Sequence, residues 1–427
     1  MEKCGRKITH FAVIMPTLIG WVMTALAVNF EMLFIGRILL GLSIGMMSPL
    51  RSVIIGEYTS PKNRGAFLTI VSLSQTFGLL LVHLIGSITS WKLTALICVV
   101  FPFISLVMTI YSPETPSWLV AKGRHEDCRE VFRWLRGEEE NSELEEMIHA
   151  RILFEKSKIL AKFDRKTNKF ESLMVTVRKP EFYKPIILMM HAHVLLNFSG
   201  GSTMSAYSTV VIASVMGPEA NAYFWMIFLD AQRLFFNVLA VFAINKFKRR
   251  TMMFTTGALS VFSQLALSGY LYLKQNLNLS FDSYIIPVVL INLKIIAVAV
   301  GMLPVPNVIG GEVFPLQYRS IGGTISVVTF SGTLFLVLKT FIYMVETITM
   351  SGVYLVYGIV IAYCMGVIYV LLPETKGKTL QQIEDEFRGK PLTLEEIEAR
   401  ESLKDNPVEA YKRRLSQQSA HSVQILA

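Results

Sequence analysis

Ten long apolar runs dominate this sequence, and each has the length of a membrane-spanning helix. An α-helix rises about 1.5 Å per residue, so about 20 apolar residues cross the hydrocarbon core of a bilayer. Polar, Gly or Pro residues separate the runs where a helix would leave the membrane. We therefore predict an all-α membrane protein whose spans cover approximately residues 8–28, 32–55, 66–87, 93–111, 184–212, 221–244, 251–273, 284–308, 321–345 and 351–372.

The composition excludes the main alternatives to a membrane protein. Hydrophobic residues make up 52% of the 427 residues and charged residues only 17%, whereas about 25% of a soluble domain is charged. The four cysteines, Cys4, Cys98, Cys128 and Cys364, lie too far apart for a zinc site or a disulfide framework. No nucleophile with a base, and no phosphate-binding loop, stands out in the sequence. We expect no metal, no cofactor and no covalent chemistry.

Basic residues in the short connections predict how the chain crosses the membrane, because cytoplasmic loops carry an excess of Lys and Arg. One side has only Lys92 and Lys274, and we assign it to the outside. This asymmetry accounts for the net charge of +9 without a nucleic-acid partner, since no basic surface interleaved with aromatic residues is found. The other side, assigned with both termini to the cytoplasm, carries Lys3, Arg6, Lys7, Lys62, Arg64, Lys246, Lys248, Arg249, Arg250 and Arg319.

One long polar insert, residues 112–183, divides the spans into four and six. Within it, Val131, Phe132 and Leu135 recur at helical spacing among charged residues, which predicts an amphipathic cytoplasmic helix over 124–136. The tail from Arg388 to Ala427 is polar and is expected to be disordered. The predicted parts are an N-terminal half (1–111), a cytoplasmic helical linker (112–183), a C-terminal half (184–372) and a cytoplasmic tail (373–427).

Three cytoplasmic motifs occur twice in the same order, once in each half. Such a repeat is typical of transporters built from two homologous halves around a site at the membrane midplane. Two spans precede the basic motif of the second half and none precedes that of the first, so we expect the first half to lack its first two helices. The repeated motifs are Gly5-Arg6-Lys7 and Lys248-Arg249-Arg250, 243 positions apart, Glu57 with Arg64 and Glu312 with Arg319, 255 apart, and Pro113-Glu114-Thr115 and Pro373-Glu374-Thr375, 260 apart.

The charged residues of these motifs suit a gate. A Glu at the end of one helix and an Arg at the start of the next can form charge-assisted pairs with each other and with the basic loop. Such pairs would close the cytoplasmic face in one state and break when the halves rock apart. Recurrence in both halves favours this role over simple anchoring at the membrane surface. The predicted gating residues are Arg6, Glu57, Arg64, Arg249, Arg250, Glu312 and Arg319.

Four stretches of the chain carry family signatures: Gly36-Arg37 with Gly41 and Gly45, EYTSPKNRG at 57–65, PETPSWL at 113–119 and PETKGKTL at 373–380. On these stretches the chain resembles the sugar porter family of the major facilitator superfamily, and within it a branch similar to insect facilitated trehalose transporters. The resemblance implies a twelve-helix carrier that works by alternating access. In the counting of that family, this chain runs from helix 3 to helix 12, in agreement with the repeat.

The resemblance also implies where a solute would bind. A sugar-binding Gln of family helix 5 corresponds to Ser72, and the second Gln and the Asn of the helix 7 motif correspond to Asn197 and Ser202. A pore-facing amide of helix 8 corresponds to Arg233, and the Trp of helix 10 to Asn307. A hexose in such a site would leave hydroxyl groups unpaired, so tight hexose selectivity of the usual kind is not expected. A sugar such as trehalose or a hexose remains the leading solute.

Ionisable residues inside predicted spans are candidates for function, because they are costly in a membrane. Asp230 and Arg233 are three residues apart and can form a pair, either a structural one or one that takes part in solute or proton binding. Arg37 matches a family Arg that pairs with an acid of helix 1 in proton-coupled members, so Arg37 and Asp230 are the coupling candidates. With Lys294 and Lys339, the five residues are positive overall, which would suit an organic anion as an alternative solute.

The prediction is therefore a carrier in the plasma membrane that moves a small polar solute. Asn278-Leu279-Ser280 is a glycosylation sequon in a loop assigned to the outside, so Asn278 is the predicted glycan site. His191 and His193 are expected to pack rather than bind metal, because two residues apart they face different sides of a helix. A rival reading is a solute sensor or a degenerate paralogue that transports nothing. The oligomeric state is left open.

Overall fold

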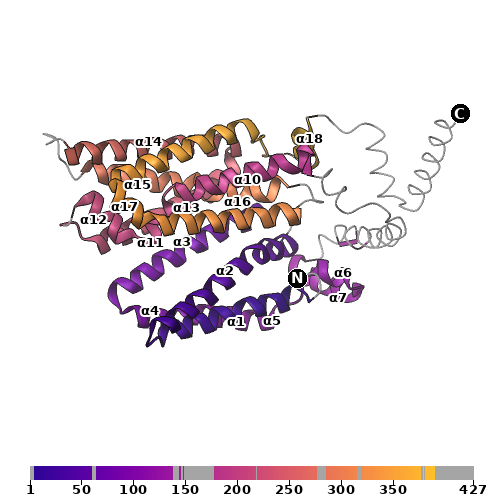
Figure 1. Ribbon diagram of the computed structural model, residues 1–427. Helices are drawn as coiled ribbons and strands as arrows, with labels where there is room; N and C mark the ends of the chain where they lie inside the picture. Colours follow the sequence, from indigo (N-terminus) through magenta and orange to yellow (C-terminus); the bar gives the residue numbers. More distant parts are fainter. Residues whose placement is uncertain are drawn as a thin grey trace.

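A computed structural model of the chain describes residues 4–59, 64–137, 144–145, 148, 177–217, 219–276, 285–314, 319–376, 378 and 380–389. The regular elements within these ranges are all helices. They run lengthwise in a bundle, with the N-terminal helices on one side and the C-terminal helices on the other (Figure 1). The all-α prediction is thus confirmed.

The N-terminal half contains four of the predicted spans. Helices α2 and α4 begin at polar caps, since the side chains of Asn29 and Ser90 accept hydrogen bonds from the N–H groups of Met32 and Leu93. The fourth predicted span is two helices joined at Val99. The bounds are α1 (Arg6–Ala25), α2 (Phe30–Tyr58), α3 (Arg64–Ile88), α4 (Trp91–Cys98) and α5 (Val100–Tyr111).

The C-terminal half contains the other six predicted spans, and two of these are broken. The run 184–212 is divided at Gly200, and the run 284–308 is interrupted by a π-helical turn before Pro304. The last two runs share α17, whose backbone leaves the helical region at Thr349 (φ 61°). The bounds are α10 (Pro180–Phe198), α11 (Gly201–Ala206), α12 (Ser208–Met216), α13 (Ala222–Lys246), α14 (Arg249–Asn276), α15 (Ile285–Ala297), η1 (Val298–Met302), α16 (Pro304–Glu312) and α17 (Arg319–Leu371).

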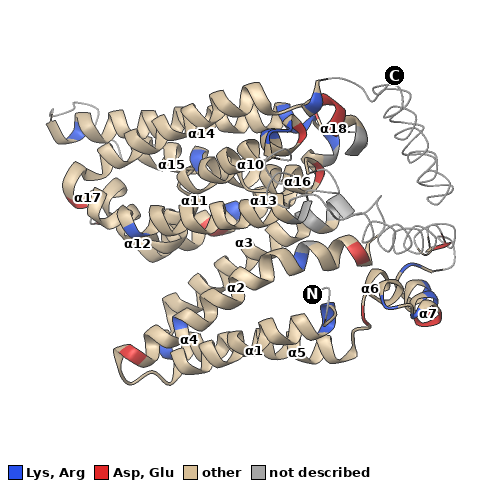
Figure 2. Ribbon diagram, turned by 45° about the vertical axis from the view of Figure 1, so that its right-hand side comes forward, with Lys and Arg blue, Asp and Glu red and all other residues tan. Residues whose placement is uncertain are grey.

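Seven helical segments in the described chain are long and apolar enough to cross a membrane, and one of them, Ile321–Leu371, holds two predicted spans. Large apolar side chains are exposed along their shafts, among them Phe34, Phe103 and Phe242. Lys, Arg, Asp and Glu gather toward one end of the bundle and are sparse on the shafts (Figure 2). Such an apolar surface is what lipid tails would cover. The chain is a multi-pass membrane protein.

The linker supplies two short helices at the charged end of the bundle, α6 (Pro116–Ala121) and α7 (His125–Arg136). The amphipathic helix predicted over 124–136 is α7. Its Phe132 is 1% exposed and packs with Leu119 and Cys128. Arg136 donates a hydrogen bond of 2.8 Å to the carbonyl of Thr59, just after α2. These contacts attach the linker to the N-terminal half.

A further helix, α18 (Leu380–Arg388), lies in the region predicted as the tail. Its Ile383 and Phe387 are buried in the core of the C-terminal half. Lys184 at the start of α10 donates a 3.0 Å hydrogen bond to the carbonyl of Phe387. The first part of the tail is therefore docked on the bundle, and residues 390–427 lie outside the described residues.

Burial of Cys128 predicts that its thiol reacts slowly with maleimide. The side chain is fully buried, and burial raises its pKa to about 11, so at pH 8 only about 0.1% of the thiol is ionised. Because the thiolate is the reactive form, maleimide is expected to modify exposed Cys4 well before Cys128. Peptide mass spectrometry after timed labelling measures this, with unfolded protein as the control. Equal labelling of both cysteines in the folded protein would contradict the packing of α6 and α7.

Candidate functional site

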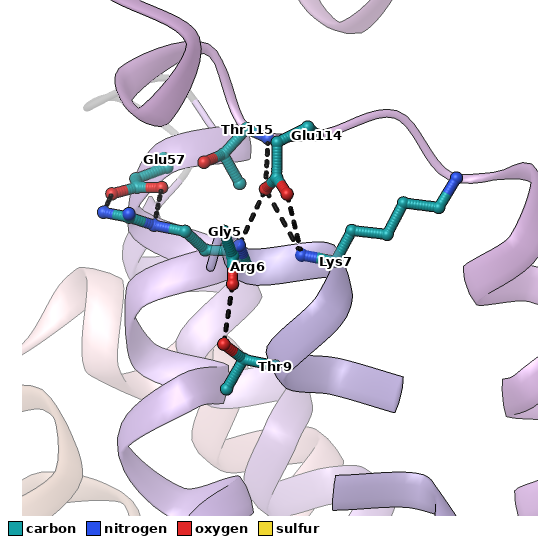
Figure 3. A network of polar contacts seen from close by, with 7 residues as sticks. All are labelled: Gly5, Arg6, Lys7, Thr9, Glu57, Glu114 and Thr115. Atoms are coloured by element: carbon teal, nitrogen blue, oxygen red, sulfur yellow. Dashed lines mark hydrogen bonds and ion pairs between the residues drawn. The ribbon is translucent and has the colours of Figure 1, made fainter. Parts of the chain in front are cut away.

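A polar network joins three segments at the charged end of the N-terminal half (Figure 3). The guanidinium of Arg6 donates two hydrogen bonds, of 2.7 and 3.0 Å, to the two carboxylate oxygens of Glu57. Glu114 accepts from the backbone N–H groups of Arg6, at 2.8 Å, and Lys7, at 3.2 Å. These N–H groups belong to the first turn of α1, which has no partner within the helix for them. Glu114 therefore completes the start of α1.

The C-terminal half repeats this network with its own copies of the motifs. Arg249 lies 3.4 Å from Glu312, and Glu374 accepts from the backbone N–H groups of Arg249, at 3.1 Å, and Arg250, at 3.2 Å. The hydroxyl of Thr375 donates to the second carboxylate oxygen of Glu312 at 2.6 Å. A carboxylate at a helix N-terminus is also favoured by the helix dipole. The two halves thus use equivalent residues for the Arg–Glu pair and for the carboxylate at the helix start, whereas within the described chain the bond from Thr375 has no counterpart at Thr115.

The partners of the predicted gating residues differ in one respect from expectation. Arg6 pairs with Glu57, and Arg249 with Glu312, so each ion pair joins helices of a single half. The sequence suggested pairs that break when the halves rock apart, and these two would instead keep the helices of each half together. Arg64 and Arg319 begin α3 and α17, and their side chains lie outside the described part of the structure.

Three side-chain bonds cross between the halves within the described residues. Each involves a residue of α3, which lies alongside α13 (Figure 1). Asn307 donates to Ser72 at 3.3 Å, Asn237 donates to Thr76 at 2.8 Å, and His83 lies 2.5 Å from Asp230. We call these three the interface bonds. They lie at successive positions along α3, with His83 nearest the end of the bundle opposite α6, α7 and α18.

The interface bonds correct one prediction and add residues that it missed. Asp230 does not form the expected pair with Arg233, because its carboxylate faces His83 on the other half. Thr76, His83 and Asn237 were not predicted, although spacing could have indicated them. Ser72, Thr76 and His83 are four and seven residues apart, and Asp230 and Asn237 seven apart, so each set shares one helical face.

Amide side chains stabilise the break between α10 and α11. Asn197 is fully buried and donates to the carbonyl of Phe330 at 3.0 Å and to the hydroxyl of Thr333 at 2.7 Å. Gln264 donates to the carbonyl of Ser199 at 3.0 Å. These bonds satisfy groups that a helix end leaves open. Of the predicted solute-binding residues, Asn197 thus connects α10 to α17, and Ser202 donates to Asn197 at 3.4 Å.

Two basic side chains lie at the same break. Arg233 donates to the hydroxyl of Ser205 on α11 at 3.0 Å. Lys294 on α15 is 3% exposed, and its ammonium lies 4.7 Å from the centre of the Tyr354 ring. That ammonium also occupies the space where Gly200 would carry a Cβ atom. A cation is favourable here, because the C-terminal end of α10 carries the negative end of the helix dipole.

Replacement of Gly200 by Ala is expected to lower the thermal stability. Gly200 has φ 80°, a conformation that costs an L-residue about 1–2 kcal/mol, and the new methyl group would displace Lys294. Gly217→Ala is the matched control, since Gly217 also has a positive φ (100°) but nothing within 4 Å of its Cβ position. Melting temperatures in detergent compare the two. Equal losses would mean that Lys294 does not constrain the break.

The remaining predicted residues lie apart from these contacts. Arg37 on α2 and Lys339 on α17 are exposed, and neither has an ion-pair partner among the described residues. His191 packs on Tyr363 and His193 on Phe330, in line with the packing role expected for them. The predicted glycan site, Asn278, lies outside the described residues.

Comparisons with known proteins agree on one family. The family model described as "Sugar (and other) transporter" matches residues 1–387. The facilitated trehalose transporter Tret1 of Bombyx mori is 28% identical over 389 residues, which are 90% of this chain and 74% of that protein. Tret1 of Drosophila grimshawi is 26% identical over 91% of this chain, which spans only 41% of that longer relative.

Solved structures share the fold. The proton:xylose symporter XylE superimposes with a TM-score of 0.72 at 20% identity, over 90% of this chain and 84% of XylE. The human organic anion transporter MFSD10 superimposes with a TM-score of 0.57 at 12% identity, over 86% of this chain and 78% of MFSD10. These similarities support the two-half helical bundle expected from the repeat.

Proposed function

Because this chain belongs to the sugar transporter family, we propose that it is a carrier that moves a small polar solute of the saccharide class across a membrane by alternating access. Trehalose and hexoses are the first candidates, since the Tret1 relatives are named for trehalose. The observation that carries the proposal is that each half has an equivalent polar network at its charged end, while a few polar bonds connect the two halves to each other. This combination suits two rigid halves that move against each other.

The two kinds of contact would have different tasks in this cycle. The end networks of Arg6 with Glu57 and of Arg249 with Glu312 are partly buried, with each side chain at most 29% exposed, so they would hold each half together while it moves. The interface bonds are few and polar, and bonds of this kind can be exchanged for bonds to water at small cost. Their opening and closing would accompany the exchange between the two access states.

A solute would bind between the halves, close to the interface bonds. Ser72 and Asn307 already meet there from opposite halves, and hydroxyl and amide groups of this kind suit sugar hydroxyls. Asn197 and Ser202 would not contact the solute directly but would stabilise the break between α10 and α11. Gating by Arg64, Arg250 and Arg319, and coupling through Arg37 or Asp230, remain part of the proposal.

We also place the carrier in the plasma membrane with both termini in the cytoplasm, on the strength of the Lys and Arg distribution. A glycan on Asn278 would support this orientation, because glycosylation occurs on the outer side. Removal of the sequon by Asn278→Gln is then expected to increase electrophoretic mobility. An epitope tag in the same loop that reacts only after the cells are permeabilised would contradict the orientation.

Uptake into proteoliposomes tests the function directly. The purified protein is reconstituted and given radiolabelled trehalose, glucose or glucuronate, with empty liposomes as the control. Saturable uptake of any sugar, accelerated by the same sugar inside the vesicles, is expected of a carrier. Specific binding of a sugar without any flux would instead favour a solute sensor, and neither binding nor flux would favour a degenerate paralogue.

A further inference from the structure

Two cations approach the break between α10 and α11 from different helices. Atom Nη2 of Arg233, on α13, lies 3.6 Å from the position of a Cβ atom on Gly201. The ammonium of Lys294, on α15, lies against the adjacent Gly200. Within the described chain, neither side chain forms an ion pair with a carboxylate. The break is therefore a positively charged region in the interior of the bundle.

The nearest acid forms its hydrogen bond with another helix. Asp230 lies one helical turn before Arg233, but its carboxylate is 2.5 Å from His83 on α3. Two cations thus share one nearby acid, and the hydrogen bond of that acid is made to His83 and to neither cation. An uncompensated charge inside a membrane bundle is costly, so it is found where it has a partner or a task. A bound anion would supply the missing partner.

Arg233 is placed to meet a solute. It is the twelfth residue of the 25 in α13 and so lies near the middle of its span. On α13, it lies between Asp230 and Asn237, which both bond to the other half. Its only hydrogen-bond acceptor among the described residues is Ser205, and its Nε is buried without an acceptor. A guanidinium has five N–H donors in a planar fork that matches carboxylate and phosphate groups.

We propose that the preferred solute is a sugar bearing one carboxylate or phosphate group, and that Arg233 binds this anionic group. The inference rests on the proposed function, because it assumes that sugars reach the space between the halves. Lys294 is too deeply buried to touch the solute, and it would contribute positive potential from behind the break. Arg233 would then decide between charged and neutral sugars, while Ser72 and Asn307 would accept the sugar body.

A competition assay with matched sugars tests the inference. Glucose, glucuronate and glucose 6-phosphate share one ring and differ at carbon 6, so they compare no charge, a carboxylate and a phosphate. Each of the three is tested as an inhibitor of the uptake of a radiolabelled sugar into proteoliposomes. At least one charged sugar is expected to inhibit about tenfold more strongly than glucose, because one charge-assisted hydrogen-bonded pair contributes about this much to binding. The arm that inhibits more strongly identifies the anionic group.

Variants separate recognition from folding. Arg233→Gln is expected to reduce the preference for the charged sugar to about one while glucose still inhibits, and Arg233→Lys to retain part of it, because the charge remains without the fork. Lys339→Gln removes the same charge from an exposed position on α17 and is expected to keep the full preference. Melting temperatures check that each variant is folded.

Three results would overturn the inference. In the first, glucose inhibits as strongly as glucuronate and glucose 6-phosphate. In the second, Arg233→Gln keeps the preference for the charged sugar. In the third, Lys339→Gln loses this preference to the same extent as Arg233→Gln. In each case the carrier function would stand, because a sugar still competes. If no sugar of either kind competes or is taken up, the proposed function fails as well, so the two failures can be told apart.

Discussion

Reversal of one charge in the N-terminal network, by Arg6→Glu, is expected to reduce uptake at least tenfold, and Glu57→Arg in the same chain is expected to restore most of it. Arg6 and Glu57 make a bidentate pair at 2.7 and 3.0 Å, with side chains only 14% and 16% exposed. Two carboxylates at this distance would repel each other with little screening by solvent. The exchanged pair would recover the attraction with donor and acceptor on opposite helices.

A double-mutant cycle measures this coupling as uptake per folded molecule and as the free energy of unfolding. We expect a coupling energy within about 0.5–3 kcal/mol, the range for neighbouring groups in one network. Arg249 and Glu312 in the other half provide the matched control. Their separation is 3.4 Å and Glu312 is 29% exposed, so their coupling should be smaller. Additive single effects at Arg6 and Glu57 would show that the network does not hold the half together.

Replacement of Asp230 by Asn is expected to shift the protein toward the state that is open at the end of the bundle near His83. The pair of His83 and Asp230 is the one interface bond, among the described residues, that involves a carboxylate. Loss of the charge leaves a weaker neutral bond, and a change of about 2 kcal/mol would shift the two populations by about thirtyfold. Thr76→Val removes a neutral interface bond and should give a smaller shift.

Spin labels measure the shift as a distance between the halves. Lys92 begins the α4 region and Lys274 lies near the end of α14, so cysteines at these positions report on one end of the bundle from opposite halves. The distance distribution of Asp230→Asn should gain a longer component, with the same labels in the unchanged protein as the control. An identical distribution would mean that this bond does not hold the halves together.

Much of the fold could be predicted because spans and repeats are local patterns. Each of the ten apolar runs overlaps one or more helices of the described chain, and α7 matches the amphipathic segment predicted over 124–136. The breaks inside two runs were not predicted. At Gly200, the conformation depends on Lys294 and Gln264 from other helices as well as on the absence of a Cβ atom. The turn at Thr349, by contrast, lies between the predicted runs 321–345 and 351–372, so it was expected.

The candidate site was less predictable, because its contacts join residues that are far apart in the sequence. Asp230 and Arg233 could be expected to pair from their spacing alone. The structure turns Asp230 toward His83, 147 residues away, and Arg233 toward Ser205, 28 residues away. Spacing along one helix predicts which residues share a face, but the residues that this face contacts depend on how the helices pack.

By itself, the sequence determined that this chain is a polytopic helical membrane protein with a repeated cytoplasmic motif, because hydrophobic length, charge asymmetry and internal repeats are properties of the chain order. The tertiary structure alone decided which charges meet. It placed the ion pairs of the motifs inside each half and set His83 against Asp230 between the halves. Among the described residues, it left Arg233 and Lys294 without an ion pair to a carboxylate. The physical reason is that an ion pair needs a separation of a few ångströms, and helix packing brings residues that are distant in sequence to that separation.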